Sequence, residues 1–204
     1  DPQKRIEEDY LRIIRFIRFK IMYNSKVDLT TNDIIKQNLD GIKKISKERI
    51  LIELYKILDL KNFINLNESI HLKEIFTLIF PEFENLKRLD RLTKISNHIK
   101  VNRDLLLALL LIDEKNNHEY FGHKYNVSNN IKDNLNLFAK NLRIIKESKN
   151  FFNKDIEKNI YLNDKNHLIN LNILNYVINT KYHLKDFSEN LKKILKSKIQ
   201  KLPI

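Results

Sequence analysis

The sequence contains no cysteine and no tryptophan, and it has only two glycines and three prolines among its 204 residues. Without cysteine, the chain can form neither a disulfide framework, nor a thiolate metal site, nor a cysteine nucleophile. Glycine and proline supply most tight turns, so their scarcity leaves little material for the hairpins of an antiparallel sheet. The fold class that this composition predicts is all-α.

Long hydrophobic runs are also missing from the sequence. The longest uninterrupted run, from Leu105 to Ile112, is far shorter than the roughly 20 residues that a membrane-spanning helix needs. The amino terminus shows no apolar signal region. We therefore expect a cytoplasmic protein with no membrane partner. Because the sequence opens with Asp1 and Pro2 rather than methionine, we also expect it to be part of a longer protein.

Positive charge is abundant, with a formal net charge of +12. A strongly basic chain favours a polyanionic partner, and nucleic acid is the commonest one. Coding bias toward lysine, isoleucine and asparagine is the alternative source of this charge. The arginines argue against it, because four of the nine fall within the first 18 residues. A guanidinium is a planar, bidentate donor, so this concentration indicates recognition.

The spacing of apolar residues predicts a series of helices separated by capping residues. Beyond residue 60 the predicted helical segments become short, which divides the chain into residues 1–60 and residues 61–204. The first three expected helices run from Arg5 to Tyr23, from a Thr30/Thr31 cap to before Gly41, and from a Ser46 cap to Leu58. The next segments are Ile70 to Ile79, Phe83 to Ile99, and Asp104 to Asp113 capped by Asn102, followed by a loop with Gly122. The last helices are expected at Ser128 to Lys146, Lys165 to Thr180, and Leu184 to Lys201.

The first helix carries the side chains with the most chemistry. Asp9 and Arg12 are three positions apart, so a continuous helix places them side by side on one face. A carboxylate only accepts hydrogen bonds and a guanidinium only donates them, so together they match the edge of a nucleobase. Arg15 and Arg18 extend the positive charge along the next turn. The alternative is a set of ordinary surface ion pairs, worth a few tenths of a kcal/mol each.

Two motifs carry a family resemblance. The stretch EDYLRIIRFIRF, from Glu8 to Phe19, resembles the EDxxRxxRxxRF motif of the class II tRNA nucleotidyltransferases. The stretch SKERILIEL, from Ser46 to Leu54, is similar to the SxERIxxEL motif that follows it in that family. The resemblance covers residues 1 to about 60, which would form the family's neck. Residues 61–204 would form its helical, tRNA-binding body and tail.

The resemblance implies a role for each motif residue. Asp9 and Arg12 would be the template that pairs with the base edge of CTP or ATP, and Arg15 and Arg18 would complete the nucleotide-binding site. The remaining motif residues would brace this template helix as structural support; they are Arg5, Glu8, Glu48, Arg49 and Glu53. The implied macromolecular partner is tRNA, whose 3′ end this family extends with CCA.

Phosphoryl transfer in the family depends on an amino-terminal head domain, in which a glycine- and serine-containing loop holds phosphate and an Asp-x-Asp pair holds Mg²⁺. Neither motif occurs in this sequence, so we expect no catalytic residue and no metal ligand here, and no activity without the head. His118 and His123 flank Gly122 but lack a third ligand at useful spacing, so we interpret them as loop histidines. The lysines from Lys192 to Lys201 fit either tRNA phosphates or a solvated face.

Two other functions fit parts of the sequence. Bacterial poly(A) polymerases share the template motif, but they tend to have proline where this chain has Tyr10, and they carry a long basic extension. The chain could also be a stand-alone helical RNA-binding module without nucleotide specificity. The motifs favour a CCA-adding transferase over both, without separating CCA addition from addition of CC or of the final A.

Overall fold

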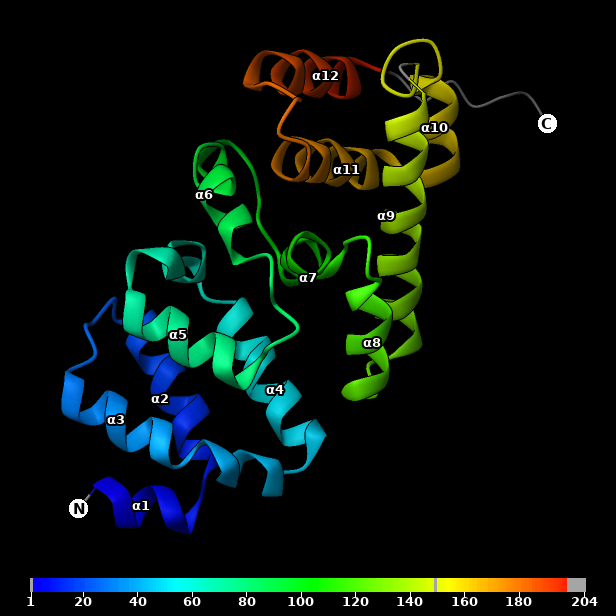
Figure 1. Ribbon diagram of the computed structural model, residues 1–204. Coiled ribbons are helices and arrows are strands. Elements are labelled where there is room, and N and C mark those ends of the chain that lie inside the picture. The colour runs from blue at the N-terminus through cyan, green and yellow to red at the C-terminus, as the bar shows by residue number, and fades with distance from the viewer. Residues whose placement is uncertain (1, 149, 198–204) are drawn as a thin grey trace. The chain divides into compact units, whose positions relative to one another are not determined.

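The computed structural model describes residues 2–148 and 150–197 (Figure 1). Within these ranges the chain forms α-helices and short 3₁₀ helices and has no strand, which confirms the predicted all-α class. No helix in the described ranges is both long and apolar enough to cross a membrane.

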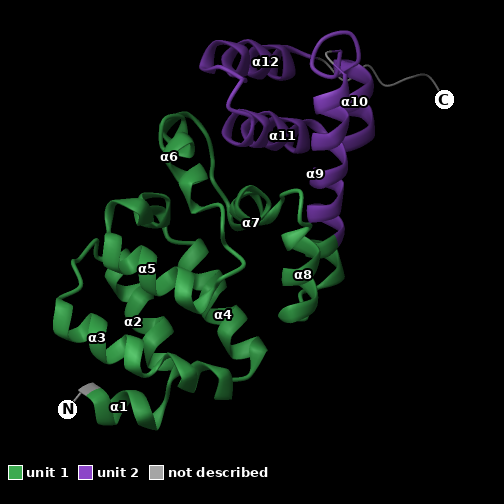
Figure 2. Ribbon diagram, in the orientation of Figure 1, with its two compact units in different colours: residues 1–132 green, residues 133–204 purple. Residues whose placement is uncertain are grey.

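The chain forms two compact units, residues 1–132 and residues 133–204 (Figure 2). The α-helices of the first unit are α1 (Pro2–Glu8), α2 (Leu11–Met22), α3 (Leu29–Gln37), α4 (Lys47–Leu58), α5 (Ile70–Ile79), α6 (Leu89–Leu92), α7 (Arg103–Leu111) and α8 (Asn117–Lys124). Its 3₁₀ helices are η1 (Leu39–Lys44), η2 (Lys61–Glu68), η3 (Leu86–Arg88) and η4 (Ser96–His98). The boundary falls within α9 (Asn129–Glu147), and the second unit continues with α10 (Ile156–Asn163), α11 (Lys165–Ile178) and α12 (Leu184–Lys196).

The first unit is built on the packing of α2 against α4. Ile13, Ile17 and Ile21 recur at helical spacing on α2 and are buried, as are Leu54 and Ile57 on α4. Facing apolar stripes at this spacing are what two amphipathic helices bury against each other. Glu53 of the second motif is buried together with these residues of α4, whereas Arg12, Arg15 and Arg49 are exposed or partly exposed.

A chain of aromatic rings extends the core away from this helix pair. Phe63 lies 5.5 Å from Phe76, measured between ring centroids, and Phe76 lies 5.0 Å from Phe80 and 5.5 Å from Phe83. Phe83 in turn meets Phe121 of α8 edge to face at 5.8 Å. Such tilted and edge contacts are favourable between aromatic side chains, so this chain of rings ties η2, α5 and α8 together.

Helix α7 is buried on all sides, and every residue from Leu105 to Leu111 lies in the core. The carbonyls at its carboxyl end therefore need partners inside the protein. Arg88 supplies them, because its Nη1 donates to the carbonyls of Leu109 at 2.7 Å and Ile112 at 2.8 Å. The amide of Asn85 donates to the Leu110 carbonyl at 3.1 Å.

The second unit packs around α11. The ring of His167 stacks on Phe138 of α9, with centroids 4.4 Å apart and planes 4° from parallel. The amide of Asn141 lies 3.1 Å from His167 Nε2. Toward α12, the amide of Asn172 donates to the Phe187 carbonyl at 2.9 Å. These buried polar contacts fix how α9 and α12 lie against α11.

Several predicted helices are confirmed, mainly where a capping residue marks the start. Ser46 caps α4 by accepting from the backbone N–H of Arg49, and Asn102 caps α7 by accepting from that of Leu105. Helix α5 has the expected bounds, and α9 and α11 differ from expectation by at most two residues. Helix α3 begins after Asp28 rather than at a Thr30/Thr31 cap, because the Asp28 carboxylate accepts from the N–H and hydroxyl of Thr31.

The expected first helix from Arg5 to Tyr23 is wrong as a single element, because the chain breaks between α1 and α2 at Asp9 and Tyr10. The Asp9 carboxylate accepts from the backbone N–H of Leu11 at 3.2 Å. A short acidic side chain that captures a nearby backbone donor competes with the helical hydrogen bonds. Asp9 therefore begins α2 instead of projecting from the middle of a longer helix.

The expected helix from Phe83 to Ile99 is also wrong, and short 3₁₀ and α-helical turns replace it. Leu86, Leu89, Leu92 and Ile95 are all buried and are spaced by three residues. A period of three suits 3₁₀ turns better than an α-helix. The apolar residues of this stretch predicted its burial, but their period argues against one continuous helix.

The loop expected around Gly122 is instead the helix α8, in which a Cβ on Gly122 would lie 3.3 Å from the Lys132 side chain. Helix α10 was not predicted. Helix α12 is described to Lys196, and Lys198 and Lys201 lie outside the described residues. The expected functional boundary near residue 60 falls inside the first compact unit and stays a prediction.

Candidate functional site

The charged residues of the two motifs lie together where the start of α2 meets the start of α4. Asp9 Oδ2 lies 3.9 Å from Nη1 of Arg15, and Asp9 Oδ1 lies 3.5 Å from Nη2 of Arg49. The Asp9 side chain remains 30% exposed. Two arginines from separate helices therefore orient this carboxylate while leaving it accessible to a ligand.

Glu53 lies beneath this cluster, with its side chain only 3% exposed. Its Oε2 lies 3.0 Å from Nη1 of Arg18, and its Oε1 lies 3.5 Å from Nε of Arg15 and 3.0 Å from Nζ of Lys56. The contact between Arg18 Nη1 and Glu53 Oε2 is an ion pair rather than a hydrogen bond, because Oε2 has no hydrogen-bond partner within the described residues. Arg18 Nε has no hydrogen-bond partner there either. Arg15 bridges the buried carboxylate and the exposed one.

Arg12 forms no ion pair with Asp9 and instead contacts Glu8. Its Nη2 lies 3.8 Å from Oε2 of Glu8, and the two side chains are 46% and 67% exposed. An exposed pair at this distance contributes little to stability. The guanidinium of Arg12 is thus held loosely at the edge of the cluster.

The remaining support residues lie at the surface. Arg5 on α1 and Glu48 on α4 are exposed, and Arg49 is about half exposed while it contacts Asp9. Phe19 is also exposed, with the guanidinium carbon of Arg18 4.9 Å from its ring centroid. The two sequence motifs thus form one surface that combines carboxylates, guanidinium groups and an aromatic ring.

Tyr10 fills the space between the start of α2 and η1. A Cβ on Gly41 would lie 2.0 Å from atoms of the Tyr10 ring, so residue 41 can carry no side chain while the ring is there. The Lys44 ammonium lies 5.6 Å from the ring centroid. Tyr10 therefore ties the turn that carries Asp9 to the body of the unit.

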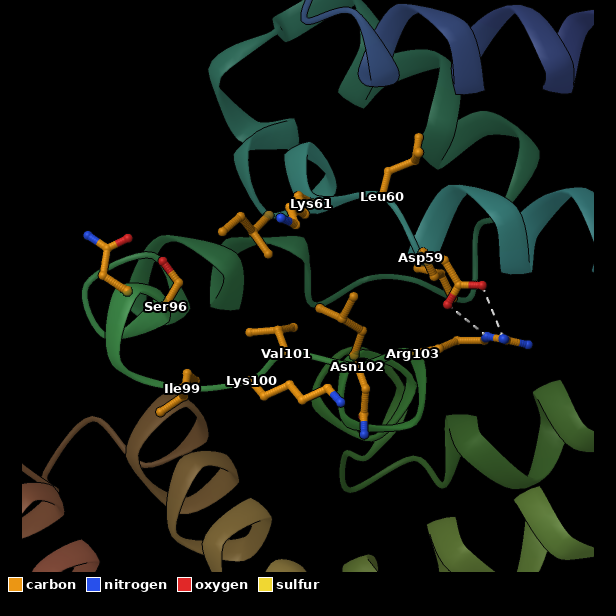
Figure 3. Close-up of a pocket in the computed structure, with 13 residues that line it drawn as sticks. Asp59, Leu60, Lys61, Ser96, Ile99, Lys100, Val101, Asn102 and Arg103 are labelled. Atoms are coloured by element: carbon orange, nitrogen blue, oxygen red, sulfur yellow. Dashed lines mark hydrogen bonds and ion pairs between the residues drawn. The ribbon is translucent and has the colours of Figure 1, made fainter.

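The first unit also has a cleft that no sequence motif predicted, lined by residues of α4, η2, η4 and α7 (Figure 3). Its basic residues are Lys61, Lys100 and Arg103. No motif marks these residues, because lysines dispersed in a lysine-rich chain give no sequence signal. Only the fold brings Lys61 and Lys100, which are far apart in the sequence, to one cleft.

Metal ligands form no cluster in the part of the chain that the structure describes. There, no group of three or more His, Asp or Glu side chains is placed to hold a metal ion. On α8, His118 is buried and His123 is exposed, and both lie on a helix rather than in the loop expected for them.

Comparison with known proteins agrees with the motifs and their geometry. Residues 26–87 match a family described as the probable RNA and SrmB-binding site of polymerase A. The chain is 30% identical over 144 residues to a CCA-adding enzyme of Staphylococcus haemolyticus, which covers 69% of this chain and 33% of that protein. These similarities support a carboxy-terminal region of the tRNA nucleotidyltransferase type.

Other CCA-adding enzymes align over longer or shorter stretches. A CCA-adding enzyme of Staphylococcus aureus is 29% identical over 170 residues, which covers 79% of this chain and 40% of that protein. A CCA-adding enzyme of Ligilactobacillus salivarius is 42% identical over 62 residues, which covers 30% of this chain and 15% of that protein. The chain thus spans about a third to two fifths of the length of the first two relatives.

Proposed function

We propose that this chain is the part of a CCA-adding tRNA nucleotidyltransferase that reads the base of the incoming CTP or ATP and holds the tRNA. The observation that carries this proposal is the partly exposed carboxylate of Asp9, held by Arg15 and Arg49 next to the loosely held Arg12. The family match and the CCA-adding relatives support the same function.

Base selection follows from what the two side chains can bind. Cytosine and adenine each present an amino group beside an unprotonated ring nitrogen, whereas uracil and guanine present a carbonyl oxygen beside an N–H. Asp9 only accepts and Arg12 only donates, so together they match cytosine and adenine and leave a mismatch with uracil and guanine. Charged partners strengthen each such hydrogen bond.

In this proposal the other arginines have different tasks. Arg15 and Arg49 hold the Asp9 carboxylate in place, so that its free lone pairs face a ligand at a fixed angle. Arg12 has to leave Glu8 to reach a base, and the exposed contact at 3.8 Å opposes this movement only weakly. Arg18 is anchored on the buried Glu53 and supports the helix that carries Arg12.

The chemical step belongs, in this proposal, to a nucleotidyltransferase head domain that works with this region. Mg²⁺ held by carboxylates of that domain would neutralise the triphosphate and activate the 3′ hydroxyl of tRNA for transfer. The contribution of this chain is to select the base and to position the tRNA end. A CCA-adding enzyme of this kind uses CTP twice and ATP once.

Base selection can be tested in an enzyme assembled from this chain and a head domain. Replacing Arg12 with alanine removes a bidentate donor and should cost about 1–3 kcal/mol of discrimination, as for other contacts to base edges. The Asp9→Ala variant should lose discrimination in the same way. The measurement is incorporation of CTP and ATP against that of UTP and GTP into tRNA that lacks its CCA end.

Lys196, exposed on α12, offers a matched control for this test. The Lys196→Ala variant should keep wild-type base selectivity even if its tRNA binding weakens. If Asp9→Ala and Arg12→Ala fold, bind tRNA and select bases as the wild type does, the charged surface is an ordinary ion-pair network and the assignment of the site is wrong.

A poly(A) polymerase is the second candidate, because the family that matches residues 26–87 is described by reference to polymerase A. The two activities differ in where they stop. With ATP as the only nucleotide, a CCA-adding enzyme should add a single A to a tRNA ending in CC, whereas a poly(A) polymerase should add a long tail. The length of the product decides between them.

A further inference from the structure

The cleft of the first unit lies apart from the charged surface around Asp9 and shares none of its residues. It has a volume of about 560 Å³ and opens between residues 58–64 and residues 96–106 (Figure 3). This volume lies within the range of small-molecule sites in proteins. The cleft is therefore large enough for one nucleotide and too small for a duplex.

Apolar side chains form much of the lining. Leu60 and Ile64 contribute from one segment, and Val101 and Leu106 contribute from the other. An apolar surface in a cleft favours a flat, poorly hydrated group such as the face of a nucleobase. Within a base-paired stem these faces are stacked against neighbouring pairs, so only an unpaired base can present one.

The charge of the cleft is positive. Arg103 neutralises Asp59, the acidic residue of the lining, because its Nε lies 3.1 Å from Oδ1 and its Nη2 lies 3.1 Å from Oδ2 (Figure 3). Lys61 and Lys100 are exposed and form no ion pair within the described ranges. Two cations are therefore left to attract an anionic group.

A polar group of the lining remains available as a donor. Asn102 uses its Oδ1 to cap α7, where it accepts from the backbone N–H of Leu105 at 2.9 Å. Its amide nitrogen makes no hydrogen bond with the part of the chain that is described. Asn97 lines the same cleft and is exposed. Amide side chains can pair with the edge of a base or with a sugar hydroxyl.

We propose that this cleft holds one unpaired nucleotide of an RNA chain, with its base against the apolar lining and its adjoining phosphates at Lys61 and Lys100. The proposal rests on the proposed role in holding tRNA and adds a specific site to it. It is a site for RNA structure, because the residues that select CTP and ATP lie elsewhere. Its ligand is an unpaired nucleotide, such as one in a loop or at a strand end.

The test compares RNA binding by the wild-type chain with binding by a Lys61→Ala/Lys100→Ala variant. The probe is a short single-stranded RNA with one 2-aminopurine, whose fluorescence reports the surroundings of the base. The double variant should bind about tenfold more weakly, and its plot of log affinity against log salt should be shallower by about 1.4, because each lost phosphate contact on a single strand removes about 0.7.

A matched variant, Lys154→Ala/Lys158→Ala, removes the same charge from exposed positions of the second unit. It should leave affinity, salt dependence and 2-aminopurine emission close to the wild type. If both double variants weaken binding equally, the loss reflects overall charge and the cleft is not a site.

Two further RNA ligands test the role of the base. An RNA of the same length with an abasic position in place of the 2-aminopurine should bind the wild type more weakly. The affinity for a fully paired duplex should not depend on Lys61 and Lys100. Equal affinity for the abasic strand, or an unchanged affinity of the Lys61→Ala/Lys100→Ala variant, overturns the proposal.

The two proposals fail in different ways. If the wild type binds tRNA and the single strand but the cleft variant does so equally well, only the cleft assignment fails. If the wild type binds neither RNA at low salt, the role in holding tRNA fails as well. Circular dichroism of each variant shows whether weaker binding reflects a lost fold.

Discussion

Asp9 and Glu53 carry the same charge in different surroundings, and the difference decides which of them a ligand can reach. Glu53 is only 3% exposed and faces Arg15, Arg18 and Lys56, whereas Asp9 is 30% exposed. A buried carboxylate loses its hydration and depends on its partners in the protein. Asp9 keeps access to solvent and can accept from a ligand without unfolding its surroundings.

Replacement of Glu53 with glutamine should therefore act on stability. The amide keeps the shape but removes the charge that faces three cations, and it leaves the largely buried Arg18 without a counterion. Because Arg15 and Lys56 are about half exposed and can be hydrated, we expect a loss of roughly 1–3 kcal/mol in the free energy of unfolding. Urea denaturation measures this loss.

Glu48 provides the matched control for Glu53, since it lies on the same helix and in the same motif but is exposed. The Glu48→Gln variant should stay within about 0.5 kcal/mol of the wild type. Equal urea midpoints for all three proteins would show that Glu53 is not the anchor of this cluster.

At the scale of whole elements, the sequence predicted helices best where local signals agree. Ser46 and Asn102 mark starts that the structure confirms, because a side-chain cap acts within one turn of the backbone it satisfies. The break at Asp9 and the turns after Phe83 could not be found in this way. Their causes are local but are not helix caps: Asp9 accepts from the backbone N–H of Leu11, and the buried residues from Leu86 to Ile95 are spaced by three.

The candidate site shows the same division. The motifs predicted which residues gather at the start of α2, but not that Arg12 would face Glu8 while Arg49 faces Asp9. A break of the helix at Asp9 changes which side chains share a face. The roles of these residues in base selection stay predictions, and the cleft with Lys61 and Lys100 had no signal in the sequence at all.

We expect the contact between α9 and α11 to make the stability of the second unit depend on pH. Burial lowers the pKa of His167 below its usual value, although the nearby Asp164 opposes the shift. The Asn141 amide donates to Nε2, which requires a neutral ring. Since the unfolded chain binds this proton more readily, stability should be full above the ordinary histidine pKa of about 6.5 and should fall as pH drops below it.

The test is to measure thermal unfolding between about pH 5 and pH 8, a range that spans the ordinary histidine pKa of about 6.5. The His167→Gln variant should lose part of the decline that the wild type shows on acidification, whereas His123→Gln, changed at an exposed histidine of α8, should keep all of it. The same pH dependence in the wild type and in His167→Gln would mean that protonation of His167 does not cause the loss of stability at low pH.

At the scale of the molecule, the excess of lysine and arginine over acidic residues favours a polyanionic ligand. A net charge of +12 should attract an RNA backbone without regard to sequence, whereas we propose that the surface at Asp9 and the cleft at Lys61 bind particular chemical groups. In this proposal, non-specific attraction and local recognition depend on different residues. They should respond differently to salt.

Binding of tRNA by the whole chain should weaken steeply as salt rises, because each phosphate that a basic side chain neutralises releases bound counterions. If the chain engages about four phosphates, affinity should fall about a hundredfold between roughly 50 and 200 mM salt. Filter binding across that range measures the slope of log affinity against log salt.

The Lys196→Ala variant should lower this slope by about one if that lysine contacts a phosphate. The Arg12→Ala variant should leave the slope nearly unchanged, because the proposed target of Arg12 is a base. An affinity that does not depend on salt, or no binding even at low salt, would mean that the positive charge of this chain reflects its lysine-rich composition and has no part in holding RNA.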